Sequence, residues 1–211
     1  MTTERAFVPA AGHDHWLSFY DPLTRLMGAR SALRALIDQA DLGPGQQVLD
    51  IGCGTGTLAV MLKQLHSLLE VVALDPDSKA LDRARRKADQ ARVEIRFVRG
   101  FGDAIPCADA SLDRVLSSFM LHHLAPDEKR ATLADVFRTL KPGGSLHLLD
   151  FAGHDQPRGV IARLLHRDDH LHDHTEGRIS AMMSATGFAS AAQVGTRRTL
   201  LGPVCFFRAE R

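Results

Sequence analysis

Aromatic residues that could stack on nucleic-acid bases are scarce in this sequence. Its 211 residues include one tryptophan and one tyrosine, and lysine plus arginine (26) almost balance aspartate plus glutamate (25). Without an excess of positive charge, the chain has no general attraction for nucleic acid or for an anionic membrane surface. We therefore expect a small-molecule partner and no nucleic-acid partner.

Cysteines and long apolar runs are also few. Cys53, Cys107 and Cys205 are widely spaced and form no C-x-x-C pair, which argues against a disulfide framework and against a cysteine-based zinc site. No apolar run reaches the roughly 18 to 20 residues that span a bilayer, and the first residues, MTTERAFVPA, lack the pattern of a signal peptide. These absences predict a cytoplasmic protein with no stable membrane insertion.

The sequence does contain an alternation of strand-like and helix-like segments. Short apolar segments typical of strands lie at residues 48–51, 70–75, 93–100, 112–121 and 145–151, and helical patterns lie at 57–66, 77–91 and 126–140. Strands separated by helices predict βαβ units, and therefore an α/β fold with a doubly wound, mostly parallel sheet and helices on both faces. Residues 141–144, KPGG, are expected to end the last helix before the next strand.

We expect one domain over residues 1–211, built from four segments. The predicted segments are an N-terminal helical cap at 1–44, a core at 45–152, a lid or insert with a helix at 153–187, and a C-terminal β-hairpin at 188–211.

The segment VLDIGCGTGTLAV, residues 48–60, puts three glycines between a strand and a helix. Such a loop lets a ligand approach the backbone and directs amide N–H groups toward it. The dinucleotide fingerprint is G-x-G-x-x-G, whereas Gly52, Gly54 and Gly56 place the third glycine one residue early. Asp50, at the mouth of the loop, suits a cofactor with an ammonium and a sulfonium better than it suits a pyrophosphate.

Two more carboxylates follow the next two strands. Asp75 lies about twenty residues beyond the loop, where a carboxylate can accept hydrogen bonds from both hydroxyls of a ribose. Asp103 follows the third strand and could accept a hydrogen bond from the exocyclic amine of adenine. The glycine-rich loop and the two spaced carboxylates together predict an adenosyl cofactor.

These motifs resemble those of class I S-adenosylmethionine-dependent methyltransferases. VLDIGCGTG, VVALDPDSKAL, GDAIPCADASLDRVLSSFMLHHL and LKPGGSLHLLDF stand in the order and spacing of that family across residues 45–152. The resemblance implies a Rossmann-like, seven-stranded sheet in the order 3-2-1-4-5-7-6 with strand 7 antiparallel. It also implies S-adenosylmethionine as the cofactor.

The resemblance assigns a role to each matching residue. It implies cofactor binding by Asp50, Gly52, Cys53, Gly54, Gly56, Asp75, Pro76, Asp103, Ala104 and Ser117. The glycine loop with Asp50 would hold the methionine end, Asp75 the ribose, and residues 76 and 103–104 the adenine. Ser117 and residues 119–120 would line the floor. More narrowly, FYDPLTRLMGARSALRALI is similar to the N-terminal segment of ubiquinone and menaquinone C-methyltransferases, which adds Tyr20 to the expected cofactor site.

Three histidines are candidates for a catalytic base. Methyl transfer from a sulfonium is an in-line displacement, so alignment alone can supply much of the rate, and a base helps when the acceptor is weakly acidic. His122 and His123 follow the fourth strand and His154 follows the fifth, at carboxyl ends of strands, where parallel sheets bind ligands. The alternative for each of them is a structural role.

A second group of histidines, His166, His170, His172 and His174, lies in the insert. Histidines four residues apart on a helix can bind zinc. The alternatives are a polar surface segment and a lid whose side chains contact the acceptor, and we predict no metal.

The expected function is S-adenosylmethionine-dependent methyl transfer to a small, apolar or aromatic acceptor, by a monomer or homodimer. One alternative is a non-catalytic protein that binds S-adenosylmethionine. The other is an NAD(P)-dependent oxidoreductase, against which the early third glycine argues.

Overall fold

The computed structural model describes residues 29–152, 177–200 and 202–211. Its strands are β1 (Gln47–Ile51), β2 (Glu70–Asp75), β3 (Arg96–Arg99), β4 (Leu112–Ser118), β5 (Leu140–Phe151), β6 (Ala192–Thr199) and β7 (Gly202–Glu210). Its helices are α2 (Ala29–Gln39), α3 (Thr57–Leu65), α4 (Ser78–Ala91), α5 (Pro126–Thr139) and α7 (Arg178–Thr186), with a 3-10 helix, η2, at Leu121–His123.

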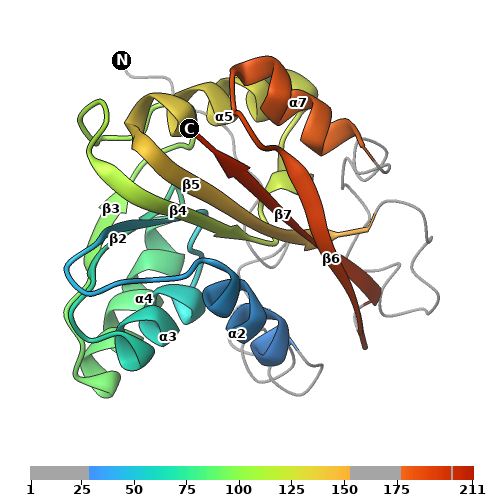
Figure 1. Cartoon of the computed structure of the whole chain (residues 1–211). Coiled ribbons are helices and arrows are strands. Elements are labelled where there is room, and N and C mark those ends of the chain that lie inside the picture. Colours follow the sequence, from blue (N-terminus) through green and yellow to red (C-terminus); the bar gives the residue numbers. More distant parts are fainter. Residues whose placement is uncertain (1–28, 153–176, 201) are drawn as a thin grey trace, which may run out of the picture.

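The strands form one sheet through the centre of the molecule, in the order β3-β2-β1-β4-β5-β7-β6 (Figure 1). β1 to β5 pair in parallel, whereas β7 is antiparallel to both of its neighbours, β5 and β6. The predicted α/β fold, the sheet order and the antiparallel seventh strand are all confirmed.

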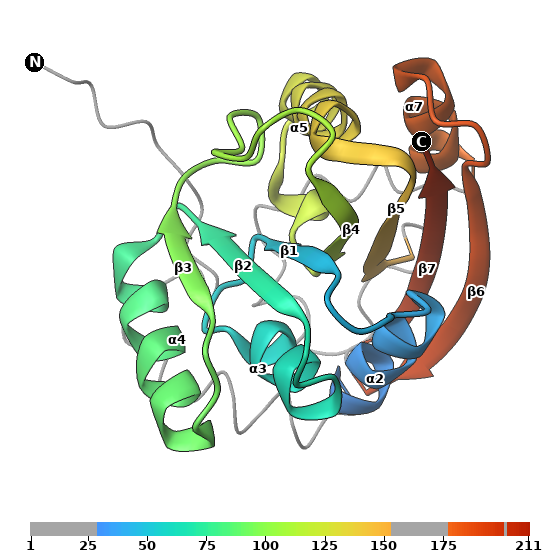
Figure 2. The same ribbon diagram turned by 60° about the vertical axis from the view of Figure 1, so that its left-hand side comes forward.

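Apolar residues on both faces of the central strands explain why helices cover both faces. Successive residues of a strand point to opposite sides, so Val48 belongs to one buried cluster and Leu49 to the other. The first cluster includes α2, α3 and α4, and the second includes α5 and α7 (Figure 2). A parallel sheet that is apolar on both faces requires this double cover.

The boundaries of three strands differ from the sequence predictions. β3 is shorter than the predicted 93–100, and β4 ends at Ser118, three residues before the predicted end at Leu121, where η2 begins. β5 begins at Leu140, so residues 141–144 lie inside the strand and do not precede it. They form a bulge, because Leu140 pairs with Leu112 and the next paired residue, Ser145, is opposite Arg114.

α2 is part of the layered core. Its residues Leu33, Leu36 and Ile37 are buried in the first cluster, and Gln39 at its end donates a hydrogen bond of 3.0 Å to the carbonyl of Phe207 in β7. The rest of the predicted cap, residues 1–28, lies outside the described residues, as do 153–176 of the predicted insert. None of the helices described is both long enough and apolar enough to cross a membrane.

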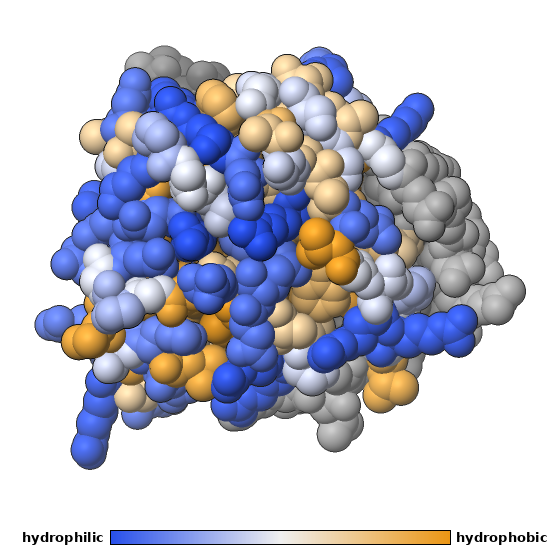
Figure 3. Space-filling model, viewed as in Figure 1, coloured by the Kyte–Doolittle hydropathy of each residue, from blue (hydrophilic) through white to orange (hydrophobic). Residues whose placement is uncertain are grey.

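The outer edge of the sheet at β6 carries charge. Its residues Arg197 and Arg198 lie beside the exposed Val194, and charged side chains on an edge strand discourage pairing with another chain. In the space-filling view of this side of the molecule, hydrophobic residues lie in separate groups among hydrophilic ones (Figure 3).

Candidate cofactor and acceptor site

The carboxyl ends of the parallel strands bring the predicted site residues together. The strand order reverses between β1 and β4, and ligands of open α/β sheets bind in the crevice at such a reversal. On one side of it lie the glycine loop after β1 and the end of β2. On the other lie η2, which follows β4, and the end of β5.

The glycine loop, residues 52–56, turns sharply beside the end of β2. The backbone N–H groups of Gly52 and Cys53 both donate to the carbonyl of Leu74, at 2.8 and 3.0 Å. Gly52 has a φ of 70°, and a Cβ atom there would lie 2.7 Å from Cβ of Met120. The loop and the segment after β4 therefore approach each other closely only because residue 52 is glycine.

Gly56, the third glycine, serves the contact between two helices. It has a φ of 75° at the start of α3, and a Cβ atom there would lie 2.8 Å from Cβ of Ala84 in α4. From α4, Lys87 donates hydrogen bonds to the hydroxyls of Thr55 (3.0 Å) and Thr57 (2.7 Å). α4 thus holds the glycine loop in place through Gly56, Thr55 and Thr57.

Asp50 is fully buried, and neither of its carboxylate oxygens has a hydrogen-bond partner among the residues described. Burial, together with the nearby charge of Asp75, raises the pKa of Asp50 to about 8, although the backbone N–H of Ala59, which forms no hydrogen bond of normal geometry with it, acts in the opposite direction. Buried polar groups are almost always hydrogen-bonded, because leaving them unsatisfied is costly. An ammonium group of a ligand, placed beside the glycine loop, would satisfy this carboxylate.

Asp75 differs from Asp50 because backbone groups already bind it. Its Oδ2 accepts from the N–H of Gly54 at 2.7 Å and its Oδ1 accepts from the N–H of Asp77 at 2.9 Å. Burial nevertheless raises the pKa of Asp75. Each carboxylate oxygen has a second acceptor site, so both oxygens can also accept hydrogen bonds from the hydroxyls of a ribose.

The turn that carries Asp103 and Ala104 crosses the end of β1. A Cβ atom at Gly102 would lie 3.0 Å from Cδ1 of Ile51, the residue before the glycine loop, and 2.9 Å from Cγ2 of Thr132 in α5. The three carboxylates predicted to bind the cofactor, at positions 50, 75 and 103, therefore lie on the same edge of the sheet.

On the other side of the crevice, His122 forms a buried pair with Asp150. Nδ1 of His122 lies 2.6 Å from Oδ1 of Asp150, and the two residues are 2% and 1% exposed. Asp150 also accepts from the backbone N–H groups of His122 (3.1 Å) and Phe151 (2.8 Å). These contacts fix the imidazole and favour the tautomer in which Nε2 carries the lone pair.

Four aromatic rings lie close together here, and one of them is that of His122 itself. The centroid of the His122 ring lies 4.0 Å from that of His123 and 5.1 Å from that of Phe151. Phe119 lies 5.0 Å from Phe151 and has a φ of 53°, a left-handed conformation that is rare for a residue other than glycine. Strained backbone of this kind clusters at functional sites.

Comparison with known proteins gives a consistent result. Residues 48–144 match a family described as a methyltransferase domain. The demethylmenaquinone methyltransferase of Thermus thermophilus is 37% identical over 145 residues, which are 67% of this chain and 64% of that protein. Residues 48–144 of this chain therefore resemble the methyltransferase domain of the class I S-adenosylmethionine-dependent methyltransferases. The chain spans between 51% and 64% of the length of the first curated relatives that it matches.

Solved structures share the fold of this chain at low identity. Phosphoethanolamine N-methyltransferase 2 of Haemonchus contortus, solved in complex with S-adenosyl-L-methionine, has a TM-score of 0.78 at 16% identity, covering all of this chain and 60% of its own. A SAM-dependent methyltransferase from Aquifex aeolicus has a TM-score of 0.69 at 18% identity, covering 92% of this chain and 95% of its own.

The structure brings most of the sequence-predicted residues to this edge, and gives Ser117 a contact within the sheet. Ser117 is buried in β4, and its hydroxyl donates to the carbonyl of Ile51 at 2.9 Å, so it ties β4 to β1. Pro76 follows β2, and its carbonyl accepts from Nε of Arg99 at 3.1 Å. Tyr20 and His154 lie outside the described residues.

Two residues of the site were missed at the sequence level. The role of Asp150 had a signal, because LLDF in β5 repeats the pattern of VLDI in β1, an acidic residue near the end of an apolar strand. Lys87 had no such signal, because its position in a basic helix is typical of a solvated face. Within the described ranges, no group of three or more histidine, cysteine or acidic side chains could hold a metal ion. The His166 to His174 cluster lies outside those ranges.

Proposed function

We propose that this methyltransferase binds S-adenosylmethionine beside Asp50 and transfers the methyl group to a small apolar or aromatic acceptor. The observation that carries the proposal is the fully buried carboxylate of Asp50, which has no hydrogen-bond partner among the described residues. The ammonium of the cofactor would pair with it, whereas the pyrophosphate of NAD(P) would bring a second negative charge to the same place. S-adenosylmethionine supplies an electrophilic methyl group on sulfur.

The contacts of the cofactor half support this assignment. The glycine loop and Asp50 would hold the methionine end, and Asp75 would accept from the ribose, since both of its oxygens keep an acceptor site. Asp103 and Ala104 lie next to Gly102, which packs on the end of β1, and would contact the edge of adenine.

The acceptor half supports an aromatic or apolar acceptor. The rings of Phe151 and His123 lie next to His122 at the ends of β4 and β5, and the ring of Phe119 lies next to that of Phe151. Aromatic side chains favour flat, apolar ligands and position them by ring stacking. The Thermus thermophilus relative is named for a demethylmenaquinone, a name that supports quinol-like acceptors among the first to be tested.

His122 is the candidate base that the contacts support best. Its buried pairing with Asp150 at 2.6 Å orients the imidazole, whose Nε2 would accept the proton that a hydroxyl or other protic acceptor loses as its bond to the methyl group forms. Asp150 would act as a positioning residue by holding the imidazole and its tautomer. His123 and His154 stay candidates for the same role. The cytoplasmic location and the monomer or homodimer state also stay predictions.

A calorimetric titration tests the cofactor assignment. Wild-type protein is titrated with S-adenosylmethionine, S-adenosylhomocysteine, NAD and NADP, alongside Asp50→Asn and Asp75→Ala. Asp82→Asn is the matched control, because it removes one carboxylate from the exposed side of α4. We expect binding of the adenosyl ligands alone, retained in the control and weakened about 100-fold in Asp50→Asn, because breaking a buried charge pair costs roughly 2–5 kcal/mol. Binding of NAD or NADP without an adenosyl response would overturn the proposal.

Turnover separates the enzyme from a non-catalytic binding protein. Quinols, phenols and amines are incubated with the protein and S-adenosylmethionine, and a mass increase of one methylene group is sought in each acceptor. We expect methylation of an aromatic acceptor. A protein that binds the cofactor tightly and methylates none of these compounds would favour the non-catalytic alternative.

A further inference from the structure

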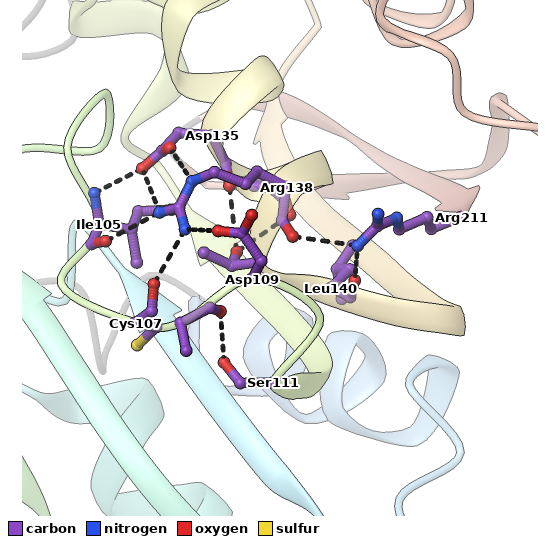
Figure 4. Close-up of polar contacts among 11 residues, drawn as sticks. Ile105, Cys107, Asp109, Ser111, Asp135, Arg138, Leu140 and Arg211 are labelled. Atoms are coloured by element: carbon purple, nitrogen blue, oxygen red, sulfur yellow. Dashed lines mark hydrogen bonds and ion pairs between the residues drawn. The ribbon is translucent and has the colours of Figure 1, made fainter.

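The segment between β3 and β4 is held to α5 by one arginine (Figure 4). Nη1 of Arg138 donates to the carbonyl of Cys107 at 3.0 Å and to Oδ1 of Asp109 at 2.5 Å, and Nη2 donates to the carbonyl of Ile105 at 3.1 Å. Nε of the same guanidinium donates to Oδ1 of Asp135 at 2.7 Å. All three nitrogens of Arg138 are therefore engaged, and three of the four groups that they contact belong to residues 105–109.

Asp135 and Arg138 together form a clamp that holds the backbone of Ile105. Oδ2 of Asp135 accepts from the backbone N–H of Ile105 at 2.6 Å, while the carbonyl of Ile105 accepts from Arg138. Both backbone polar groups of Ile105 are thus bound by a single ion pair on α5, and its side chain is only 3% exposed. A planar guanidinium with a carboxylate partner has a fixed geometry, so the backbone at this residue has little freedom.

The clamp lies next to Asp103 and Ala104, the residues proposed to recognise adenine. Asp103 and Ala104 stand between Gly102, which packs against Ile51 and Thr132, and Ile105. The turn is closed by a hydrogen bond of 3.2 Å from the N–H of Ala104 to the carbonyl of Phe101. Packing therefore holds one end of the turn, and the ion pair of α5 holds the other.

We propose that Arg138 is a positioning residue for adenine recognition, holding the turn at residues 102–105 so that the carboxylate of Asp103 meets the exocyclic amine. The inference rests on the proposed cofactor and adds the residue that sets its base specificity. Arg138 acts through Ile105, and no direct contact with the cofactor is required. A charged acceptor held in a fixed position should discriminate well between an amine donor and an oxygen at the same place on the base.

The test compares S-adenosylhomocysteine with S-inosylhomocysteine, which carries a carbonyl oxygen in place of the adenine amine. In wild-type protein we expect S-adenosylhomocysteine to bind about 10- to 100-fold more tightly, the range of a hydrogen bond to a charged group. Arg138→Met should lower that ratio to below about threefold. The change should come mainly from a lower affinity for S-adenosylhomocysteine. Arg138→Lys and Asp135→Asn should give intermediate ratios, because each keeps only part of the clamp.

Arg211→Met is the matched control. Arg211 donates to the carbonyls of Arg138 and Leu140 and lies over the ring of Phe137 at 4.9 Å, so it ties the C-terminal end of α5 without touching the turn (Figure 4). Its removal should destabilise the protein to unfolding by denaturant and leave the binding ratio unchanged. A loss of general stability alone therefore cannot imitate the expected result.

The outcomes separate two failures. If the wild type binds neither homocysteine ligand, the proposed function fails. If the wild type discriminates and the folded Arg138 variants discriminate equally well, the cofactor stands and the inference about Arg138 is overturned. Should Arg138→Met not fold, as judged by circular dichroism, the ratios of Arg138→Lys and Asp135→Asn decide in the same way.

Discussion

Asp50 and Asp150 occupy equivalent places in the two halves of the sheet and have opposite surroundings. Each follows a leucine near the end of a parallel strand, and they are 0% and 1% exposed. The carboxylate of Asp150 accepts from the imidazole of His122 and from two backbone N–H groups. That of Asp50 has no hydrogen-bond partner among the described residues.

The difference shows what each half of the edge can do. A buried carboxylate must be protonated, paired or hydrogen-bonded. Asp150 meets this requirement within the protein, so it can hold His122 in one orientation whether or not a ligand is present. Asp50 meets it by protonation, with a pKa of about 8, or by pairing with a ligand that carries positive charge. In the proposed function, the half that carries Asp50 therefore binds the cofactor, and the half that carries Asp150 orients a base.

The largest effect is expected in the acceptor half. His122→Gln should lower kcat about 10²- to 10⁴-fold, the usual contribution of a general base, and leave the affinity for S-adenosylmethionine unchanged. Asp150→Asn should lower kcat within the same range, because the amide would donate to Nδ1 and place the proton on Nε2. Single-turnover kinetics with an acceptor found by the turnover screen would measure both.

His123→Gln provides the comparison for these two variants. Its ring neighbours that of His122 at 4.0 Å, whereas the hydrogen bonds of Asp150 described above come from His122 and Phe151. We expect its kcat to fall less than tenfold, a small effect beside the contribution of a base. A normal kcat in His122→Gln together with a strongly reduced kcat in His123→Gln would make His123, and not His122, the candidate base.

The next effect concerns the pH dependence of cofactor binding. Asp50 has a pKa of about 8 without ligand, and its ionised form is the one that pairs with a cation. Below that pH, binding must release a proton, so the affinity for S-adenosylhomocysteine should rise by up to about tenfold per pH unit between pH 6 and 8 and then level off. Calorimetry in buffers of different ionisation enthalpy would count the released proton.

Asp50→Asn tests whether this proton belongs to Asp50. The variant should bind weakly and with little pH dependence over the same range. An unchanged slope in Asp50→Asn would assign the proton to another group, of which Asp75 is the first candidate because burial raises its pKa as well. In that case the unpaired carboxylate of Asp50 would no longer explain the pH dependence of cofactor binding.

The residues proposed to bind the cofactor lie in local sequence patterns, whereas the pairing of His122 with Asp150 does not follow from a local pattern. Glycine spacing and the carboxylates at 50, 75 and 103 are local patterns, and each lies within a few residues of a strand end. The His122–Asp150 pair joins residues 28 positions apart in sequence, so it depends on the register between β4 and β5. The Arg138 clamp also depends on tertiary packing, because it joins α5 to a turn about 30 residues earlier.

The strand boundaries carry the same lesson. The glycines of KPGG predict the end of an element, yet β5 already begins at Leu140 and carries these residues as a bulge. Lys141 binds both oxygens of Asp113 in β4 at 2.8 Å. A contact between neighbouring strands therefore overrides the local turn signal.

The smallest effect is expected in stability without ligand, and it should have opposite signs at the two aspartates. Because the folded-state pKa of Asp50 is raised from 3.8 to about 8, its contribution to stability is full below pH 3.8 and is lost as the pH rises through about 8. Between pH 6 and 9 the wild type should thus lose about 2–3 kcal/mol relative to Asp50→Asn, at about 1.4 kcal/mol per pH unit below the pKa. Asp150→Asn should instead be less stable than the wild type by about 1–3 kcal/mol at both pH values, because it disturbs satisfied hydrogen bonds. Denaturant unfolding of the three proteins at pH 6 and pH 9 measures both differences. If the free energy of unfolding changed equally with pH in the wild type and in Asp50→Asn, Asp50 would have a partner that keeps it ionised.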